Sequence, residues 1–190
     1  MIYLCRHGET VSNREGRIQG QLESPLTPLG RNQAGAMAAR LHALIDEPKA
    51  WRLCASPLGR ARDTAEIIGA RLGLSVELDA QLMEVHVGGW QGMTHKALSR
   101  AHPETVGDRL WCFRGPGGET YDDVMARVSG WLAEQAPEPG RQVIAVSHGV
   151  AGRLLRAAYA GLEPQAAMRQ DIPQDALFRM SGGAIERIAC

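Results

Sequence analysis

The sequence has 190 residues, of which 44% are hydrophobic and 22% are charged, and these proportions are typical of a globular domain that folds in water. Basic and acidic residues number 21 each, so the formal net charge is zero and the chain has no excess positive charge with which to bind nucleic acid. No apolar stretch is long enough to span a membrane and the first residues lack the pattern of a secretory signal, so we expect a cytoplasmic protein without a membrane partner.

Apolar runs of strand character alternate along the chain with helical periodicities, and this alternation predicts an α/β fold. Thr27 suits the N-cap of the first long helix, and Pro28 suits its first turn. In chain order we predict a strand over 2–5, a helix from 27, a strand over 52–55, a helix over 59–72, a strand over 76–78, a helix over 119–134, a strand over 143–146, a helix over 149–159, and a closing hairpin of 176–180 and 184–188.

The segment 81–118 is rich in glycine, tryptophan and histidine and has no sustained period. We predict a single domain over 1–190 in which this segment forms a cap or insertion. Trp90, Trp111 and Phe113 are the residues that we expect to pack it.

Three of the predicted strands are followed within a few residues by histidine or arginine. Arg6 and His7 follow the first strand, Arg60 follows the second, and His148 follows the strand over 143–146. Ligands of open α/β sheets bind at the carboxyl ends of the strands, so these four side chains meet if the strands are parallel neighbours. Two arginines and two histidines suit a phosphate dianion. The helices that start near Gly59 and after His148 are expected to add backbone N–H groups.

The residues beside the two histidines suit a reaction at a bound phosphate. Gly8 and Gly149 have no side chain that would keep a ligand from the backbone. We expect no metal and no cofactor, because the cysteines form no CxxC pair and no compact set of carboxylates and histidines accompanies the site.

Several strings along the chain resemble the motifs of the histidine phosphatase superfamily, the phosphoglycerate mutase-like proteins. They occur in the order of that family and span most of the chain: RHGET at 6–10 with Asn13 after it, SPLTPLGRNQA at 24–34, SPLGRARDTA at 56–65, LMEVHVGGWQG at 82–92, GGET at 117–120 and VSHGV at 146–150.

The resemblance implies a three-layer αβα sandwich with a mixed, mostly parallel central sheet. It also implies a metal-independent phosphomonoester hydrolase that acts on a small phosphorylated metabolite through a phosphohistidine intermediate, as in the broad-specificity and α-ribazole phosphatases. His7 would be the nucleophile, which requires a neutral ring with one nitrogen free and the other donating to a fixed acceptor. We predict a backbone carbonyl near Gly8 as that acceptor. Glu84 would protonate the leaving oxygen and later deprotonate water. The complete implied set is Arg6, His7, Arg60, Glu84 and His148 for catalysis, and Asn13, Gln19, Gly20 and Gly149 for substrate binding.

The chain departs from the family pattern at three positions. Gln91 stands where a glutamate is usual, Glu23 stands where an aspartate is usual, and His86 stands where an acidic or small residue is more frequent. We expect these residues to contact the substrate side of the site rather than the phosphate. The sequence therefore defines the type of reaction more closely than the identity of the substrate.

Two other functions stay open at this point. A mutase of the phosphoglycerate mutase type shares the first half-reaction, but the segment between Glu84 and His148 is shorter than the mutases of the family generally carry. A non-catalytic protein that binds a phosphorylated ligand is disfavoured by the presence of both His7 and Glu84. The sequence does not fix the oligomeric state, for which a homodimer is one option.

Overall fold

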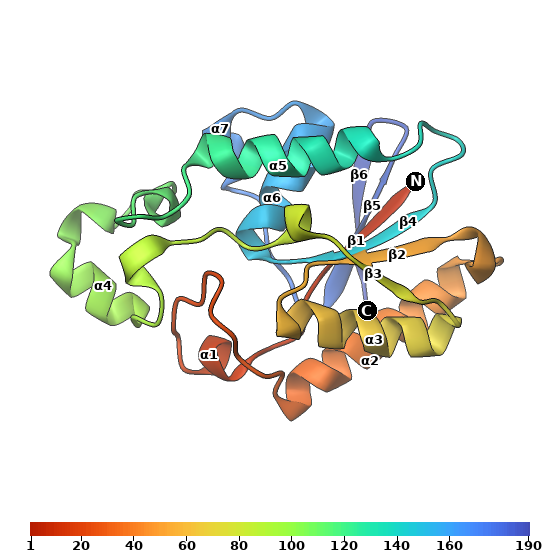
Figure 1. The fold of residues 1–190 in the computed structure, drawn as a ribbon, viewed down its shortest axis with the longest axis horizontal. Helices are drawn as coiled ribbons and strands as arrows, with labels where there is room; N and C mark the ends of the chain where they lie inside the picture. The colour runs from red at the N-terminus through yellow and green to blue at the C-terminus, as the bar shows by residue number, and fades with distance from the viewer.

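The computed structural model describes all of residues 1–190 and contains a six-stranded sheet with helices on both faces (Figure 1). The sheet has the order β3-β2-β4-β1-β5-β6. Its first four strands are parallel, and β5 and β6 are antiparallel to their neighbours. The predicted three-layer fold with a mixed, mostly parallel sheet is therefore confirmed. The strands are β1 (Ile2–Arg6), β2 (Arg52–Ala55), β3 (Val76–Leu78), β4 (Val143–Ser147), β5 (Ala176–Ser181) and β6 (Ala184–Ala189).

Two pairs of helices form the outer layers of the sandwich. In Figure 1, α2 and α3 lie below the sheet, and α5 and α6 lie above it. The helix predicted from 119 begins two residues later, because the hydroxyl of Thr120 rather than Glu119 caps it. None of the helices is long and apolar enough to cross a membrane. The helices are α1 (Val11–Arg14), α2 (Pro28–Leu44), α3 (Gly59–Leu72), α4 (His95–Ala101), α5 (Tyr121–Glu134), α6 (Gly149–Ala160) and α7 (Pro164–Ala167).

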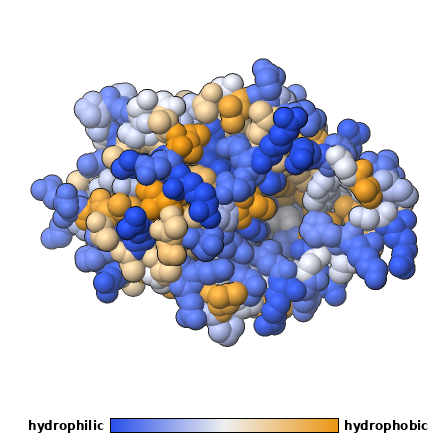
Figure 2. Space-filling view, turned by 180° about the vertical axis from the view of Figure 1, so that it is seen from behind, coloured by the Kyte–Doolittle hydropathy of each residue, from blue (hydrophilic) through white to orange (hydrophobic).

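Side chains alternate between the two faces of the sheet along each strand, and this alternation divides the core into two parts. Ile2 and Leu4 of β1 face the core that includes Trp131 of α5, while Tyr3 and Cys5 face the core that contains Met37 of α2. The central strands β1 and β4 therefore bury both of their faces, as their continuous apolar runs predicted. The surface opposite to the view of Figure 1 is mainly hydrophilic, with apolar residues in small separate groups (Figure 2).

The segment 81–118 has more structure than the sequence predicted. It contains α4 and several short 3₁₀ turns, and it extends from the left end of the sheet in Figure 1. Trp90 is buried and stacks on Trp111, with 6.3 Å between the ring centroids. The N–H of Ile18 donates to the carbonyl of Met93, so the segment is joined to the loop that follows β1.

Candidate active site

The strand order brings the predicted side chains together. β4 lies between β1 and β2, so the carboxyl ends of these three parallel strands are adjacent. Arg6 ends β1, His7 follows it, His148 follows β4, and Arg60 lies in the first turn of α3 after β2. The rings of His7 and His148 have centroids 5.2 Å apart. The expected convergence of two histidines and two arginines is therefore what the fold produces.

His7 is held as a neutral ring with one nitrogen free of a proton. Its side chain is 2% exposed, and its Nδ1 lies 2.8 Å from the carbonyl oxygen of Gly8. The Nε of Arg60 can only donate, and it lies 3.3 Å from His7 Nε2. Nε2 must therefore accept, and the proton is on Nδ1. Burial holds the pKa of His7 well below its usual value, and the charges of Arg6 and Arg60 lower it further.

His148 is also a buried neutral ring, and Ser56 fixes its orientation. The Nε2 of His148 lies 2.8 Å from Ser56 Oγ, which also accepts the N–H of Leu58 at 3.3 Å. The Nδ1 of His148 has no hydrogen-bond partner. Burial lowers the pKa of His148 strongly, and the charge of Arg60 adds to this effect. Ser56 was missed in the sequence, although it lies in the SPLGRARDTA string directly after β2.

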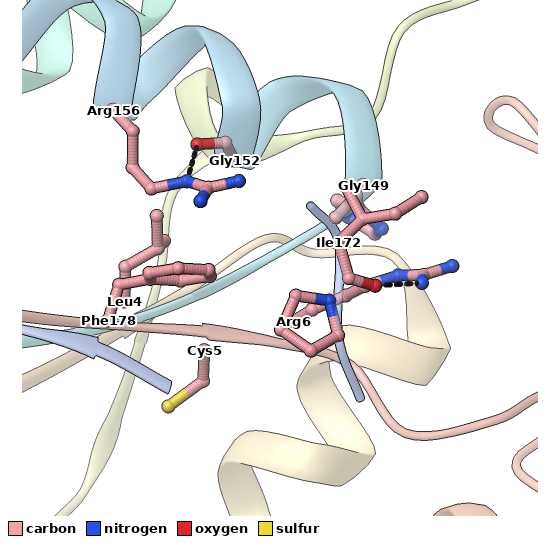
Figure 3. Close-up of a pocket in the computed structure, with 10 residues that line it drawn as sticks. Leu4, Cys5, Arg6, Gly149, Gly152, Arg156, Ile172 and Phe178 are labelled. Atoms are coloured by element: carbon pink, nitrogen blue, oxygen red, sulfur yellow. Dashed lines mark hydrogen bonds between the residues drawn. The ribbon is translucent and has the colours of Figure 1, made fainter. Parts of the chain in front are cut away.

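The two arginines are anchored by backbone carbonyls. Arg60 is buried and donates to the carbonyls of Leu22 at 2.9 Å and Gly20 at 2.7 Å. Arg6 donates to the carbonyl of Ile172 at 2.7 Å, as Figure 3 shows. The Nε of Arg6 is buried and has no partner. Buried donors are normally satisfied, so an unpaired Arg6 Nε at the carboxyl end of the sheet suits an anionic ligand.

Carboxylates of the protein accept some of the N–H groups at both helix N-termini that were predicted to bind the ligand, and for the other N–H groups, such as that of Gly149, the prediction stays a prediction. Glu84 accepts the N–H groups of Val150 at 3.1 Å and Ala151 at 3.0 Å at the start of α6. Glu23 accepts the N–H of Gly59 at 3.0 Å at the start of α3. A helix N-terminus attracts any nearby anion, and here the protein supplies the anion itself.

The segment that carries Glu84 is held by an ion pair that sequence reasoning missed. Arg127 of α5 donates to the carbonyls of Met83 at 2.6 Å and Glu84 at 3.1 Å. Its Nε also pairs with Glu119 at 2.8 Å, and Glu119 accepts the N–H of His86 at 2.8 Å. Glu119 therefore supports the site and does not cap α5. A helical arginine in a sequence gives no sign of such a partner, because the contacts are distant in the chain.

The predicted substrate-binding residues lie around the same pocket. Asn13 Oδ1 accepts the N–H of Thr10 and the amide of Gln174, both at 3.2 Å, and Gln19 accepts the hydroxyl of Thr10 at 3.0 Å. Gly20 has a φ of 53° and presents its carbonyl to an arginine.

The two glycines beside the histidines have different roles. A Cβ at Gly149 would lie 3.6 Å from a Glu84 carboxylate oxygen and 3.8 Å from Arg6 Nε, so this glycine faces the site as predicted. A Cβ at Gly8 would lie 2.1 Å from the carbonyl oxygen of Gly30. Gly8 is therefore required by the packing of the β1 loop against α2, rather than by a ligand.

The three departures from the family pattern do not line the pocket beside His7, contrary to our expectation that they contact the substrate side of the site. Gln91 accepts the N–H of Gln21 at 2.7 Å and lies against the ring of His86. The Gln21 side chain in turn donates to the Glu84 carbonyl at 3.0 Å. Gln91 and His86 therefore support the loop that anchors Arg60, and Glu23 caps α3.

A cavity of about 140 Å³ opens beside His7. All the predicted site residues line it except His148, which borders a cavity of about 10 Å³ together with Arg6 and Gly149 (Figure 3). Apolar side chains, including those of Val85 and Trp111, complete the wall of the larger cavity. It therefore combines a cationic floor, which fits a phosphate group, with an apolar wall.

Comparison with known proteins identifies the family. Residues 2–182 match the model described as "Histidine phosphatase superfamily (branch 1)". A glucosyl-3-phosphoglycerate phosphatase of Mycobacterium tuberculosis strain H37Rv is 38% identical over 162 residues, covering 78% of this chain and 70% of the relative. A protein of Enterobacter sp. strain 638 named "Probable phosphoglycerate mutase GpmB" is 35% identical over 181 residues, covering 88% and 78%.

Solved structures agree with the sequence comparison. The structure of a mycobacterial glucosyl-3-phosphoglycerate phosphatase in complex with VO3 has a TM-score of 0.84 and 34% identity, and the match covers 100% of this chain and 96% of that chain. The predicted fold and the predicted enzyme class, a phosphatase of the histidine type, are confirmed at the level of the family. This chain belongs to branch 1 of the histidine phosphatase superfamily.

Proposed function

We propose that this chain hydrolyses phosphate monoesters of small metabolites through a phosphohistidine at His7. The observation that carries the proposal is the fixed state of His7, whose protonated Nδ1 is bound by Gly8 and whose Nε2 lone pair faces the cationic pocket. Arg60 donates to that lone pair, Arg6 lines the same cavity, and the ring centroid of His148 lies 5.2 Å from that of His7. Such a site stabilises charge on a transferring phosphoryl group without a metal ion.

The reaction divides into two displacements at phosphorus. In the first, the Nε2 lone pair of His7 forms a bond to phosphorus as the ester P–O bond breaks, and Glu84 gives a proton to the leaving oxygen. In the second, the ionised Glu84 takes a proton from water, the water oxygen bonds to phosphorus, and the P–N bond breaks to restore the neutral ring. The anchored guanidiniums of Arg6 and Arg60 hold the phosphoryl oxygens in both steps.

The contacts of Glu84 hold its carboxylate at the cavity beside His7. In the structure its carboxylate accepts three N–H groups, from Val85, Val150 and Ala151.

We also propose that 81–118 caps the site within a single domain. Two observations support this role: Val85, Val87 and Trp111 of this segment line the cavity, and the N–H of Ile18 ties the segment to the loop after β1. A wall of this kind would contact the body of a substrate whose phosphate lies at His7.

The test of the mechanism compares His7→Gln with the wild type and with His42→Gln, which changes an exposed histidine of α2. We expect His7→Gln to lose turnover of p-nitrophenyl phosphate by at least about a thousandfold, and His42→Gln to match the wild type. Rapid mixing with substrate and mass spectrometry should detect a phosphorylated peptide that contains His7. Turnover retained by His7→Gln would exclude it as the nucleophile. A chelator should leave the rate unchanged.

A mutase is the second candidate, since the GpmB relative named above is 35% identical. Incubation with 3-phosphoglycerate and 2,3-bisphosphoglycerate separates the two functions. Release of inorganic phosphate without formation of 2-phosphoglycerate supports the phosphatase, and the reverse result supports the mutase. The names of the mycobacterial relatives make glucosyl-3-phosphoglycerate the first substrate to include in a screen.

A further inference from the structure

A second and larger cavity adjoins the phosphate pocket. Its volume is about 490 Å³, against about 140 Å³ for the pocket beside His7. Trp111 lines both cavities, so they are neighbours that share this residue. The body of a substrate whose phosphate lies at His7 can therefore extend across Trp111 into the second cavity.

The second cavity contains two arginines whose charges are not neutralised. Neither Arg109 nor Arg153 forms an ion pair, and the one side-chain hydrogen bond of Arg153 runs from Nε to the carbonyl of Gln170 at 2.6 Å. The terminal amino groups of both guanidiniums remain available to a ligand. The acidic residue of the cavity, Asp108, is paired with Arg114 at 2.6 Å. The unpaired charge at this wall is therefore positive.

Arg153 lies close to the phosphate site along α6. It follows Gly149 by four residues, so the two share one face of the helix. The charge of Arg153 also acts on the phosphate site. Burial is the main reason that the pKa of Arg6 is lowered, and the charge of Arg153 lowers this pKa further, by more than the charge of Arg60 does. A second anion at Arg153 would thus belong to the same bound molecule as a phosphate at Arg6.

We propose that Arg109 and Arg153 form a subsite for a second anionic group of the substrate, which makes the substrate a phosphate monoester of a carboxylic acid. Planar guanidiniums bind carboxylates through paired N–H groups. Arg153 is half-buried and supplies the larger part of the selectivity, while Arg109 is exposed and adds less. This inference rests on the proposed phosphatase function and deepens it.

The experiment uses two pairs of substrates that differ only in a carboxylate or a hydroxymethyl group. The pairs are 3-phosphoglycerate with glycerol 3-phosphate, and 6-phosphogluconate with sorbitol 6-phosphate. We expect the wild type to prefer an acid, and Arg153→Met to lower kcat/KM for that acid by about 10- to 100-fold, with less than about a twofold change for the alcohol. Arg109→Met should lower kcat/KM for the acid by about threefold. Arg100→Met, which removes an exposed arginine of α4 outside the cavity, is the matched control and should change neither.

Each outcome bears on one of the two proposals. Absence of acid preference in the wild type, or an equal loss on acid and alcohol in Arg153→Met, would refute the subsite and leave the phosphatase standing. Failure of the wild type to hydrolyse any of the four esters or p-nitrophenyl phosphate would refute the phosphatase. In that event calorimetry of 6-phosphogluconate against sorbitol 6-phosphate decides the subsite alone, with equal affinities refuting it.

Discussion

Acidification should destabilise the protein through the two buried imidazoles. His7 and His148 are each 2% exposed, and burial, reinforced by the neighbouring guanidiniums, holds the pKa of both well below the ordinary value. In the unfolded chain both rings return to a pKa of about 6.5. As the pH falls through that value the unfolded state takes up two protons that the folded state does not, so stability falls with pH.

The size of the effect follows from linkage. Each ring that stays neutral in the folded state costs about 1.4 kcal/mol of stability for every pH unit below about 6.5. The loss at about pH 5 is therefore at most about 2 kcal/mol for each ring, or about 4 kcal/mol for the pair. Above about pH 7 the two rings do not make the free energy of unfolding depend on pH. The losses continue until the pH reaches the lowered pKa values of the folded protein.

Urea unfolding in phosphate-free buffer at several values between about pH 7.5 and pH 5 measures this slope. His148→Gln should be less sensitive to acid than the wild type by about 1.4 kcal/mol per pH unit, because Arg6 and Arg60 still keep His7 neutral. His42→Gln should keep the slope of the wild type, and carboxylates common to all variants cancel in the comparison. Parallel curves for His148→Gln and the wild type would refute the claim that the buried ring is neutral.

Three further predictions concern single residues. Glu84→Gln should lower kcat on an alkyl phosphate by about 10²- to 10⁴-fold, and much less on p-nitrophenyl phosphate, whose leaving group needs no proton; equal losses in the two assays would contradict the acid role. Ser56→Ala removes the group that orients His148 and should lower kcat/KM by about tenfold with little change in Tm; an unchanged rate would show that Ser56 is not needed to position the ring. Gly8→Ala places a methyl group 2.1 Å from the carbonyl of Gly30, so thermal unfolding should show a loss of more than about 3 kcal/mol; a variant as stable as the wild type would contradict the close packing of these two backbone segments.

Local signals explain why much of the fold could be predicted. The strand over 52–55 and the helix over 59–72 have the predicted bounds, because a short apolar run and a helical stripe each depend on residues close in the chain. The position of His7 and His148 followed from the rule that ligands bind at the carboxyl ends of parallel strands. The carbonyl of Gly8 could be predicted as the partner of His7 because it is the next residue.

The contacts that could not be predicted from the sequence join residues that are distant in the chain. Nothing in the sequence distinguishes these residues from others of the same type. Glu84 accepts N–H groups at the start of α6, and Glu23 accepts an N–H group at the start of α3. Arg127 resembles any arginine of an amphipathic helix, yet it anchors the backbone of Glu84. Hydrophobic periodicity reports which face of an element is buried, but it contains no information on which polar partners meet there.

The arrangement of charges joins two requirements of phosphoryl transfer in one set of residues. A nucleophilic imidazole must be neutral, and a phosphate dianion must be met by fixed positive charge. Arg6 and Arg60 meet both requirements, because the charges that would bind the dianion also hold the pKa of His7 down. Replacing either arginine by a neutral residue therefore weakens the binding of phosphate and also makes protonation of His7 easier. The resulting loss of kcat/KM should grow as the pH falls, whereas a loss of binding alone would be independent of the protonation of His7.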